Sequence, residues 1–187
     1  MTTEDNVSIL AETIADDVKS LRLQSRVVLF AKMSAVSSAI ANTETSVLSM
    51  SLPANTLVVG NIFRFSFMAL HTNNASASTS ITRVRIGTTA LLGAVAAQNS
   101  FVNGTTARTN AITHIEGTIL ITAIGAAGSA IGQLHVYKGY VSATTPAGTT
   151  VPAVVVTTID NVIALTFISG GGSASETFYA GTIELLR

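Results

Sequence analysis

The chain has 187 residues with no cysteine and no tryptophan, and its ten basic residues balance ten acidic ones. The lack of cysteine excludes disulfide scaffolds, zinc fingers, iron–sulfur clusters and thiol proteases. A net charge of zero argues against a nucleic-acid-binding protein, which needs a basic field to displace counterions from phosphates.

The mean hydropathy of +0.52 is high, and the uncharged stretch 117–137 approaches the length of a membrane span. Gly, Thr, Ser and Gln interrupt that stretch, however, and its apolar residues alternate where a spanning helix would be nearly continuous. We therefore predict no membrane insertion. The opening MTTEDN carries acidic residues where a secretory signal carries Lys or Arg, so no signal peptide is expected.

Charge is distributed unevenly along the chain. Residues 1–44 hold ten charged side chains, and the much longer stretch 45–187 holds the other ten. The second stretch consists largely of Ser, Thr, Ala, Gly, Val and Ile. We predict two parts on this basis, an N-terminal helical anchor or stalk with its linker over 1–44 and a β-sandwich domain over 45–187.

The first part has the pattern of an amphipathic helix. Its apolar residues recur at spacings of three and four, namely Val7, Leu10, Ile14, Val18 and Leu21. Such a stripe has to be buried against a partner surface. It fits docking onto the chain's own β domain, self-association into a short parallel bundle, or insertion into another protein.

The second part has the period-two alternation of β-strands. Strands are predicted at 45–52, 60–70, 79–87, 109–124, 130–142, 153–158, 161–169 and 175–187. The stretch 26–42 is a linker or first strand, in which 27–30 is either a strand or a continuation of the helix. Turns rich in Asn, Gly, Ser and Thr join them, and no second helix is evident. The expected fold is mainly β, an antiparallel jelly-roll-like sandwich of about eight strands preceded by an N-terminal α-helix.

Some of these strands are apolar on both faces. In 109–124, Ile112, Leu120 and Ile124 oppose Ile115, Ile119 and Ile121. One face can form the core, whereas the other needs a neighbour. We expect a homo-oligomer, a trimer packed about its axis, and the alternative is a second face covered by the chain's own loops or helix.

Candidates for chemistry are few. His71, His114 and His135 lack metal-ligand spacing, no serine lies in a GxSxG elbow, and the four carboxylates of the β domain are scattered. The glycine-rich segments 125–128 and 170–172 lack the lysine and the helix of a phosphate loop, and Asp160-Asn161 is expected to be a turn. We therefore predict no catalytic residue, no metal site, no cofactor and no enzymatic activity.

Four residues are candidates for surface recognition. Arg64, Arg83 and Arg85 are expected to point outward and could form a basic cluster for acidic glycans or carboxylates, or they are ordinary solvent-facing side chains. Phe101, in a predicted loop at 98–108, could stack on a sugar. The plainer interpretation is that this loop and the loop at 71–80 are only connections.

The chain resembles the small jelly-roll fibre, tip and decoration proteins of tailed bacteriophage virions. The residues that carry the resemblance are DNVSILAETIADDVKSLR, LPANTLVVGNIFRFSFMA, STSITRVRIGTTALLGA, HIEGTILITAIGAAGSAIGQLHVYKG and LTFISGGGSASETFYAGTIELLR. The resemblance implies a trimer, docking on other virion proteins through the N-terminal segment, and a location in the virion after synthesis in the host cytoplasm.

Two functions follow from this resemblance. One is a tail-fibre or tip protein that attaches to a glycan or protein of the host surface, and the other is a capsid decoration or cement protein that stabilises the shell. A helical stalk ahead of the β domain favours the fibre. A cellular carbohydrate-binding module is less well matched, because such modules expose Trp or Tyr and this chain has no Trp and three Tyr.

Overall fold

The computed structural model describes residues 27–33, 37–40, 42–74, 78–139, 147–148, 152–170 and 174–186. Within these ranges the chain forms strands and no helix. The strands are β1 (Val27–Lys32), β2 (Ser37–Ile40), β3 (Glu44–Leu52), β4 (Ile62–Asn73), β5 (Ser78–Gly87), β6 (Ala94–Asn103), β7 (Arg108–Ala123), β8 (Ser129–Lys138), β9 (Ala147–Gly148), β10 (Ala153–Val154), β11 (Asn161–Ile168) and β12 (Ser175–Leu186). The predicted helix with Val7, Leu10, Ile14, Val18 and Leu21 lies outside the described residues.

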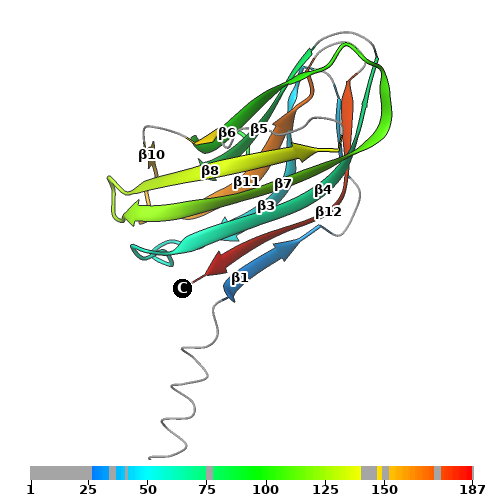
Figure 1. The fold of residues 1–187 in the computed structure, drawn as a ribbon. Helices are drawn as coiled ribbons and strands as arrows, with labels where there is room; N and C mark the ends of the chain where they lie inside the picture. Colours follow the sequence, from blue (N-terminus) through cyan, green and yellow to red (C-terminus); the bar gives the residue numbers. More distant parts are fainter. Residues whose placement is uncertain are drawn as a thin grey trace, which may run out of the picture.

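These strands form two antiparallel sheets that lie one behind the other (Figure 1). The larger sheet has the order β1-β12-β4-β7-β8-β10, with β2 also paired to β12 and β9 to β8. The smaller sheet has the order β3-β11-β5-β6. A mainly β fold made of two antiparallel sheets, as the sequence predicts, is thereby confirmed.

The chain alternates between the two sheets. Among its longer strands, β1, β12, β4 and β7 lie side by side in the larger sheet, and β3, β11, β5 and β6 in the smaller one. This interleaving is the strand order of two interlocked Greek keys, the arrangement of a jelly roll. Strand β8 is an addition, since it forms a hairpin with β7 and widens the larger sheet.

The core lies between the sheets and is made by the inward half of each alternating strand. From the larger sheet β4 contributes Phe63, Phe65 and Phe67, all buried. From the smaller sheet β11 contributes Phe167, whose ring meets Phe178 edge-on at a centroid distance of 5.6 Å. Packing of this kind needs no metal or disulfide, because the apolar area removed from water supplies the main driving force.

Several boundaries differ from the predicted ones, and the strand predicted at 153–158 is only β10, Ala153–Val154. The β domain begins by Val27, since β1 pairs with β12 from Val27 to Lys32, so a division at residue 44 is wrong. Residues 94–103 form β6, although this stretch was expected to be partly loop. Its Ala, Gln and Asn residues have weak strand preference, and pairing along the whole of β5 overrides it.

Turns join the strands at 53–55 and 125–128, whereas most of the glycine-rich segment 170–172 lies outside the described residues. Asn55, at the end of Pro53-Ala54-Asn55, has a φ of 59°, a left-handed conformation that Asn tolerates. The segment 125–128 closes the β7–β8 hairpin, with Gly125 at a φ of 100° and the Gly128 amide donating to the Gly125 carbonyl. It is a turn rather than a phosphate loop.

Gly181 on β12 provides a test of the core. It pairs with Phe67 across the strands, and a Cβ added at Gly181 would lie 2.1 Å from Phe67 Cδ1. We expect Gly181→Ala to lower the free energy of unfolding by about 1–3 kcal/mol through overpacking, measured by urea denaturation. Gly139→Ala is the control, since its added Cβ would come no closer than 3.6 Å to Ile112 O. Equal stability of the two variants would contradict the packing described.

A candidate ligand-binding face on the larger sheet

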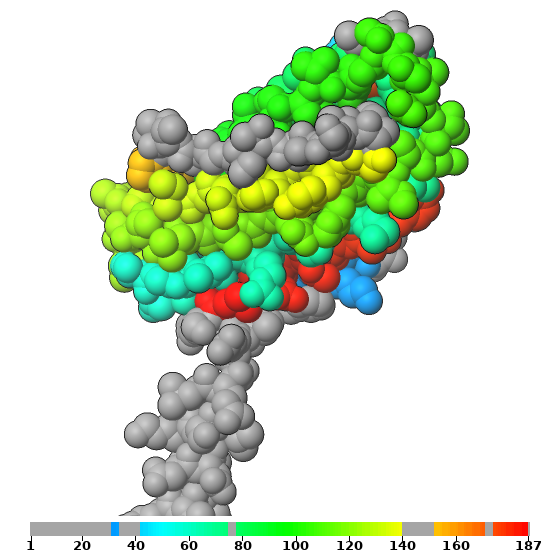
Figure 2. All heavy atoms as spheres, in the orientation of Figure 1, coloured from blue at the N-terminus to red at the C-terminus, as the bar shows by residue number. Residues whose placement is uncertain are grey.

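The outer face of the larger sheet carries polar and aromatic side chains in cross-strand rows. Strand register places Arg64 of β4 opposite Thr118 of β7, and Thr118 opposite Gln133 of β8. The next row is Ser66, Glu116 and His135, and the row after it is Met68, His114 and Tyr137. Directly opposed residues on one face of an antiparallel pair are close enough for their side chains to interact. Figure 2 shows β8, β7, β4 and β12 side by side on this face.

A shallow hollow of about 400 Å³ lies over these rows. Its lining combines hydroxyl, amide, carboxylate, guanidinium, imidazole and phenol groups. The residues are Arg64, Phe65, Ser66, Glu116, Gly117, Thr118, Gln133, His135 and Tyr137. A few convergent polar groups beside an aromatic ring are the lining typical of a ligand site.

Three rings form a stack at one side of the hollow. The ring of Tyr137 lies 6.1 Å from that of His114, at an interplanar angle of 29°, and 6.0 Å from that of His135, at 16°. The Tyr137 hydroxyl is 3.4 Å from His135 Nδ1. Tyr137 remains 45% exposed. The stack orders an aromatic side chain at the rim while leaving it accessible to a ligand.

Charged side chains on this face are held loosely. His114 Nε2 lies 3.6 Å from Glu116 Oε1, and Arg64 Nη1 lies 3.9 Å from Glu184 Oε2. The side chain of Arg64 is 61% exposed. Solvent-exposed pairs at such distances contribute little to stability. Arg64 and Glu116 can therefore reorient toward a ligand at small energetic cost.

Arg83 and Arg85 lie elsewhere, so a single basic cluster with Arg64 is wrong. Both belong to β5 of the smaller sheet, whereas Arg64 belongs to β4 of the larger one. Their guanidinium groups bind Glu44 of β3, with Arg83 Nη1 at 2.9 Å from Oε2 and Arg85 Nε at 2.7 Å from Oε1. The Thr166 hydroxyl donates to the same carboxylate at 2.6 Å. The two arginines thus join three strands of their own sheet.

Phe101 is not an exposed platform, and that prediction is wrong. Its side chain points inward from β6 and is only 8% exposed. The ring packs on Phe167 at a centroid distance of 6.2 Å, and the ammonium of Lys138 lies 3.9 Å from the ring centroid. Because β6 extends to Asn103, the predicted loop 98–108 is largely strand.

Gln133, His135 and Tyr137 were missed by sequence reasoning. The signal was present, since Leu134 and Val136 alternate with them and are buried, so the intervening residues have to face outward. His114 and Glu116 lie on the same face of β7, because residues two apart on a strand point the same way. What the sequence could not supply is the register that places Ser66 and His135 on either side of Glu116.

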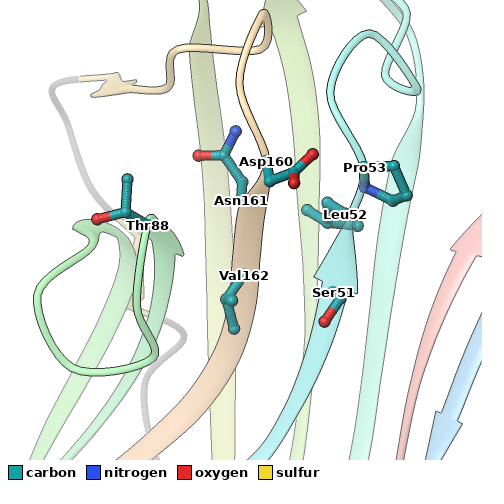
Figure 3. A pocket seen from close by; sticks show the side chains of 7 residues that line it. All are labelled: Ser51, Leu52, Pro53, Thr88, Asp160, Asn161 and Val162. Atoms are coloured by element: carbon teal, nitrogen blue, oxygen red, sulfur yellow. The ribbon is translucent and has the colours of Figure 1, made fainter.

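A second hollow, of about 210 Å³, lies at the end of the smaller sheet (Figure 3). It is lined by Ser51, Leu52, Pro53, Thr88, Asp160, Asn161 and Val162. Asp160 Oδ1 accepts a hydrogen bond from the Ala54 amide at 2.8 Å. Asn161 Nδ2 donates to the carbonyls of Val156 and Ile159. The turn lies at 157–159, one position before the predicted Asp160-Asn161, and Asn161 already begins β11. The polar groups of both residues fix this loop.

Within the described ranges, no three His, Cys, Asp or Glu side chains lie together in a way that could hold a metal ion. Nor does the described part of the chain contain a helix long and apolar enough to cross a membrane.

Comparisons with known proteins give a weak structural similarity. No protein-family model matches the sequence, and no curated protein matches it. Among solved structures, the CBM2 module of the evolved Dit of Lactobacillus casei BL23 phage J-1 is 12% identical, with a TM-score of 0.31. The alignment covers 74% of this chain and 68% of that one.

The Glu44 cluster predicts a dependence of stability on pH. Burial alone would raise the pKa of the Glu44 carboxyl, but hydrogen bonds from Arg85 and Thr166 and the charges of Arg85 and Arg83 lower that pKa from 4.5 to about 2. A carboxyl whose pKa is lower in the folded than in the unfolded state stabilises the fold above its unfolded pKa. This contribution is lost as the pH falls from about 4.5 to about 2.

We therefore expect Glu44→Gln to lower the free energy of unfolding by about 1–3 kcal/mol at pH 7. The difference between the wild type and this variant should shrink as the pH falls through the window given above, measured by urea denaturation at a series of pH values. Asp160→Asn is the control, since it lies outside the cluster. A difference that stays constant down to pH 2 would contradict the assignment.

Proposed function

We propose that the chain is a non-enzymatic structural protein of a bacteriophage virion that attaches to a glycan of the host surface. The observation that carries the proposal is the hollow on β4, β7 and β8, where the exposed Tyr137 ring borders Arg64, Glu116 and Gln133. Sugars present hydroxyl groups at their edges and apolar C–H faces, and they are bound by polar groups beside an aromatic ring. The phage context comes from the resemblance of the sequence to jelly-roll virion proteins.

In this proposal the β domain is a jelly roll carried outward, and the N-terminal segment docks on other virion proteins. The protein acts as a homotrimer. Support for assembly comes from Met68 and Ile112, large apolar side chains that remain exposed on the larger sheet at one end of the hollow. Exposed apolar groups gathered on one face favour association with a neighbour.

The alternative is a capsid decoration or cement protein, for which the same exposed apolar residues would contact shell subunits. The two functions differ in copy number and in effect. An attachment protein occurs in few copies and binds host cells when isolated. A cement protein occurs in many copies and raises the resistance of the particle to heat.

Glycan binding is tested on an array of bacterial capsular and cell-wall polysaccharides. We expect the full chain to bind a subset of them, and Tyr137→Ala to weaken binding about tenfold or more, equivalent to about 1.4 kcal/mol. Tyr179→Ala is the matched control, since Tyr179 is also exposed, at 54%, but lies on β12 outside the hollow. Absence of binding, or an equal loss in both variants, would contradict attachment through this face.

The subunit count is tested by light scattering on the full chain at micromolar concentration. We expect a species of three times the 19.2 kDa chain mass. Met68→Ser combined with Ile112→Ser should shift this species toward the monomer if the exposed apolar residues form the contact. A monodisperse 19.2 kDa species for the wild type would refute the trimer.

A further inference from the structure

A cluster of polar side chains lies buried between the sheets, on the opposite side of β8 from the hollow. Lys138 of β8 and Glu176 of β12 come from the larger sheet, and Asn103 of β6 comes from the smaller one. The side chain of Lys138 is 2% exposed and that of Glu176 is fully buried. Asn103 is fully buried as well. Burial of an amine and a carboxylate is costly, so their arrangement needs an explanation.

The three groups contact one another closely. Lys138 Nζ lies 3.1 Å from Asn103 Oδ1 and 2.9 Å from Glu176 Oε1. Because Oδ1 is bonded directly to Cγ, the amine is within reach of the amide carbon of Asn103. The Asn103 amide nitrogen donates to the hydroxyls of Ser78 and Ser80, both at 2.9 Å, so the amide is fixed in orientation.

Burial favours a neutral, nucleophilic amine. Burial lowers the pKa of Lys138 from 10.5 to about 8, although the charge and hydrogen bond of Glu176 oppose this. Glu176 Oε1 is positioned to accept a proton from the ammonium, and His71 Nδ1 lies 2.8 Å from the same oxygen. The Phe101 ring beneath Nζ helps to exclude water, which would otherwise compete for the amide carbon.

From this arrangement we infer that Lys138 and Asn103 form an intramolecular isopeptide bond that joins β8 to β6, with Glu176 as the proton-transferring residue. Glu176 takes a proton from the Lys138 ammonium, and the free Nζ electron pair attacks Cγ of Asn103. The Cγ–Nδ2 bond then breaks, and the amide nitrogen takes up a proton from Nζ and leaves as ammonia. A primary amine and a primary amide become a secondary amide and ammonia, with no oxidant or reductant.

The bond is tested by mass spectrometry of the purified full chain. Loss of ammonia makes the denatured protein about 17 Da lighter than its sequence. Trypsin should not cleave after Lys138, so peptide 86–108 should be recovered covalently attached to peptide 109–187. Recovery of 86–108 and 109–138 as separate peptides would overturn the inference.

The peptide map is essential because Asn103 precedes Gly104. An Asn-Gly sequence can also lose ammonia by closing to a succinimide, which gives the same mass change in the intact protein. A succinimide leaves 86–108 unlinked and leaves Lys138 cleavable. That outcome would likewise overturn the inference.

Variants assign the roles. Lys138→Arg keeps a cation but removes the nucleophile, and Glu176→Gln removes the proton acceptor, so both should show the full mass and unlinked peptides. Asn99→Ala is the control, since Asn99 is a buried amide on the same strand that donates to Leu134 O, and the linked peptides should persist. A linked product in Lys138→Arg would also contradict the assignment. The tryptic peptide map of the wild-type chain tests for the Lys138–Asn103 bond even where a variant fails to fold.

Discussion

The apolar contact between the inner faces of the two sheets is the constraint on which the remaining features depend. It fixes which half of each alternating strand faces inward, and thereby which half is left for the surface. On β8 this places Leu134 and Val136 in the core and His135 and Tyr137 on the outer face. A shift of one residue in register would exchange these roles, so the core determines the composition of the candidate ligand site.

The outer faces of the two sheets differ in how their charged side chains are paired. On the outer face of the smaller sheet, Arg83, Arg85 and Glu44 bind one another and are withdrawn from recognition. On the outer face of the larger sheet, the pairs of Arg64 with Glu184 and of His114 with Glu116 are longer and more exposed. Charged side chains in close ion pairs contribute to the fold, whereas charged side chains in loose, exposed pairs can turn toward a ligand and bind it.

Much of the sheet structure could be predicted from the sequence, because Phe63, Phe65 and Phe67 alternate with polar residues and reveal both strand and face. The strand β6 could not, since its Ala, Gln and Asn residues carry no clear period and its formation depends on pairing with β5. Contacts such as that of Glu44 with Arg83 need a register that no local pattern provides. The inward orientation of Lys138 could be predicted, since Lys138 follows Leu134 and Val136 at intervals of two residues along β8.

The strands β9 and β10, each of two residues, lie along β8 at the margin of the larger sheet. A long unpaired margin offers backbone donors and acceptors to a strand of another molecule and so invites uncontrolled polymerisation. Here the backbone groups of β8 are partly occupied by these short segments. Lateral growth of this sheet from copy to copy along the β8 margin is thereby discouraged.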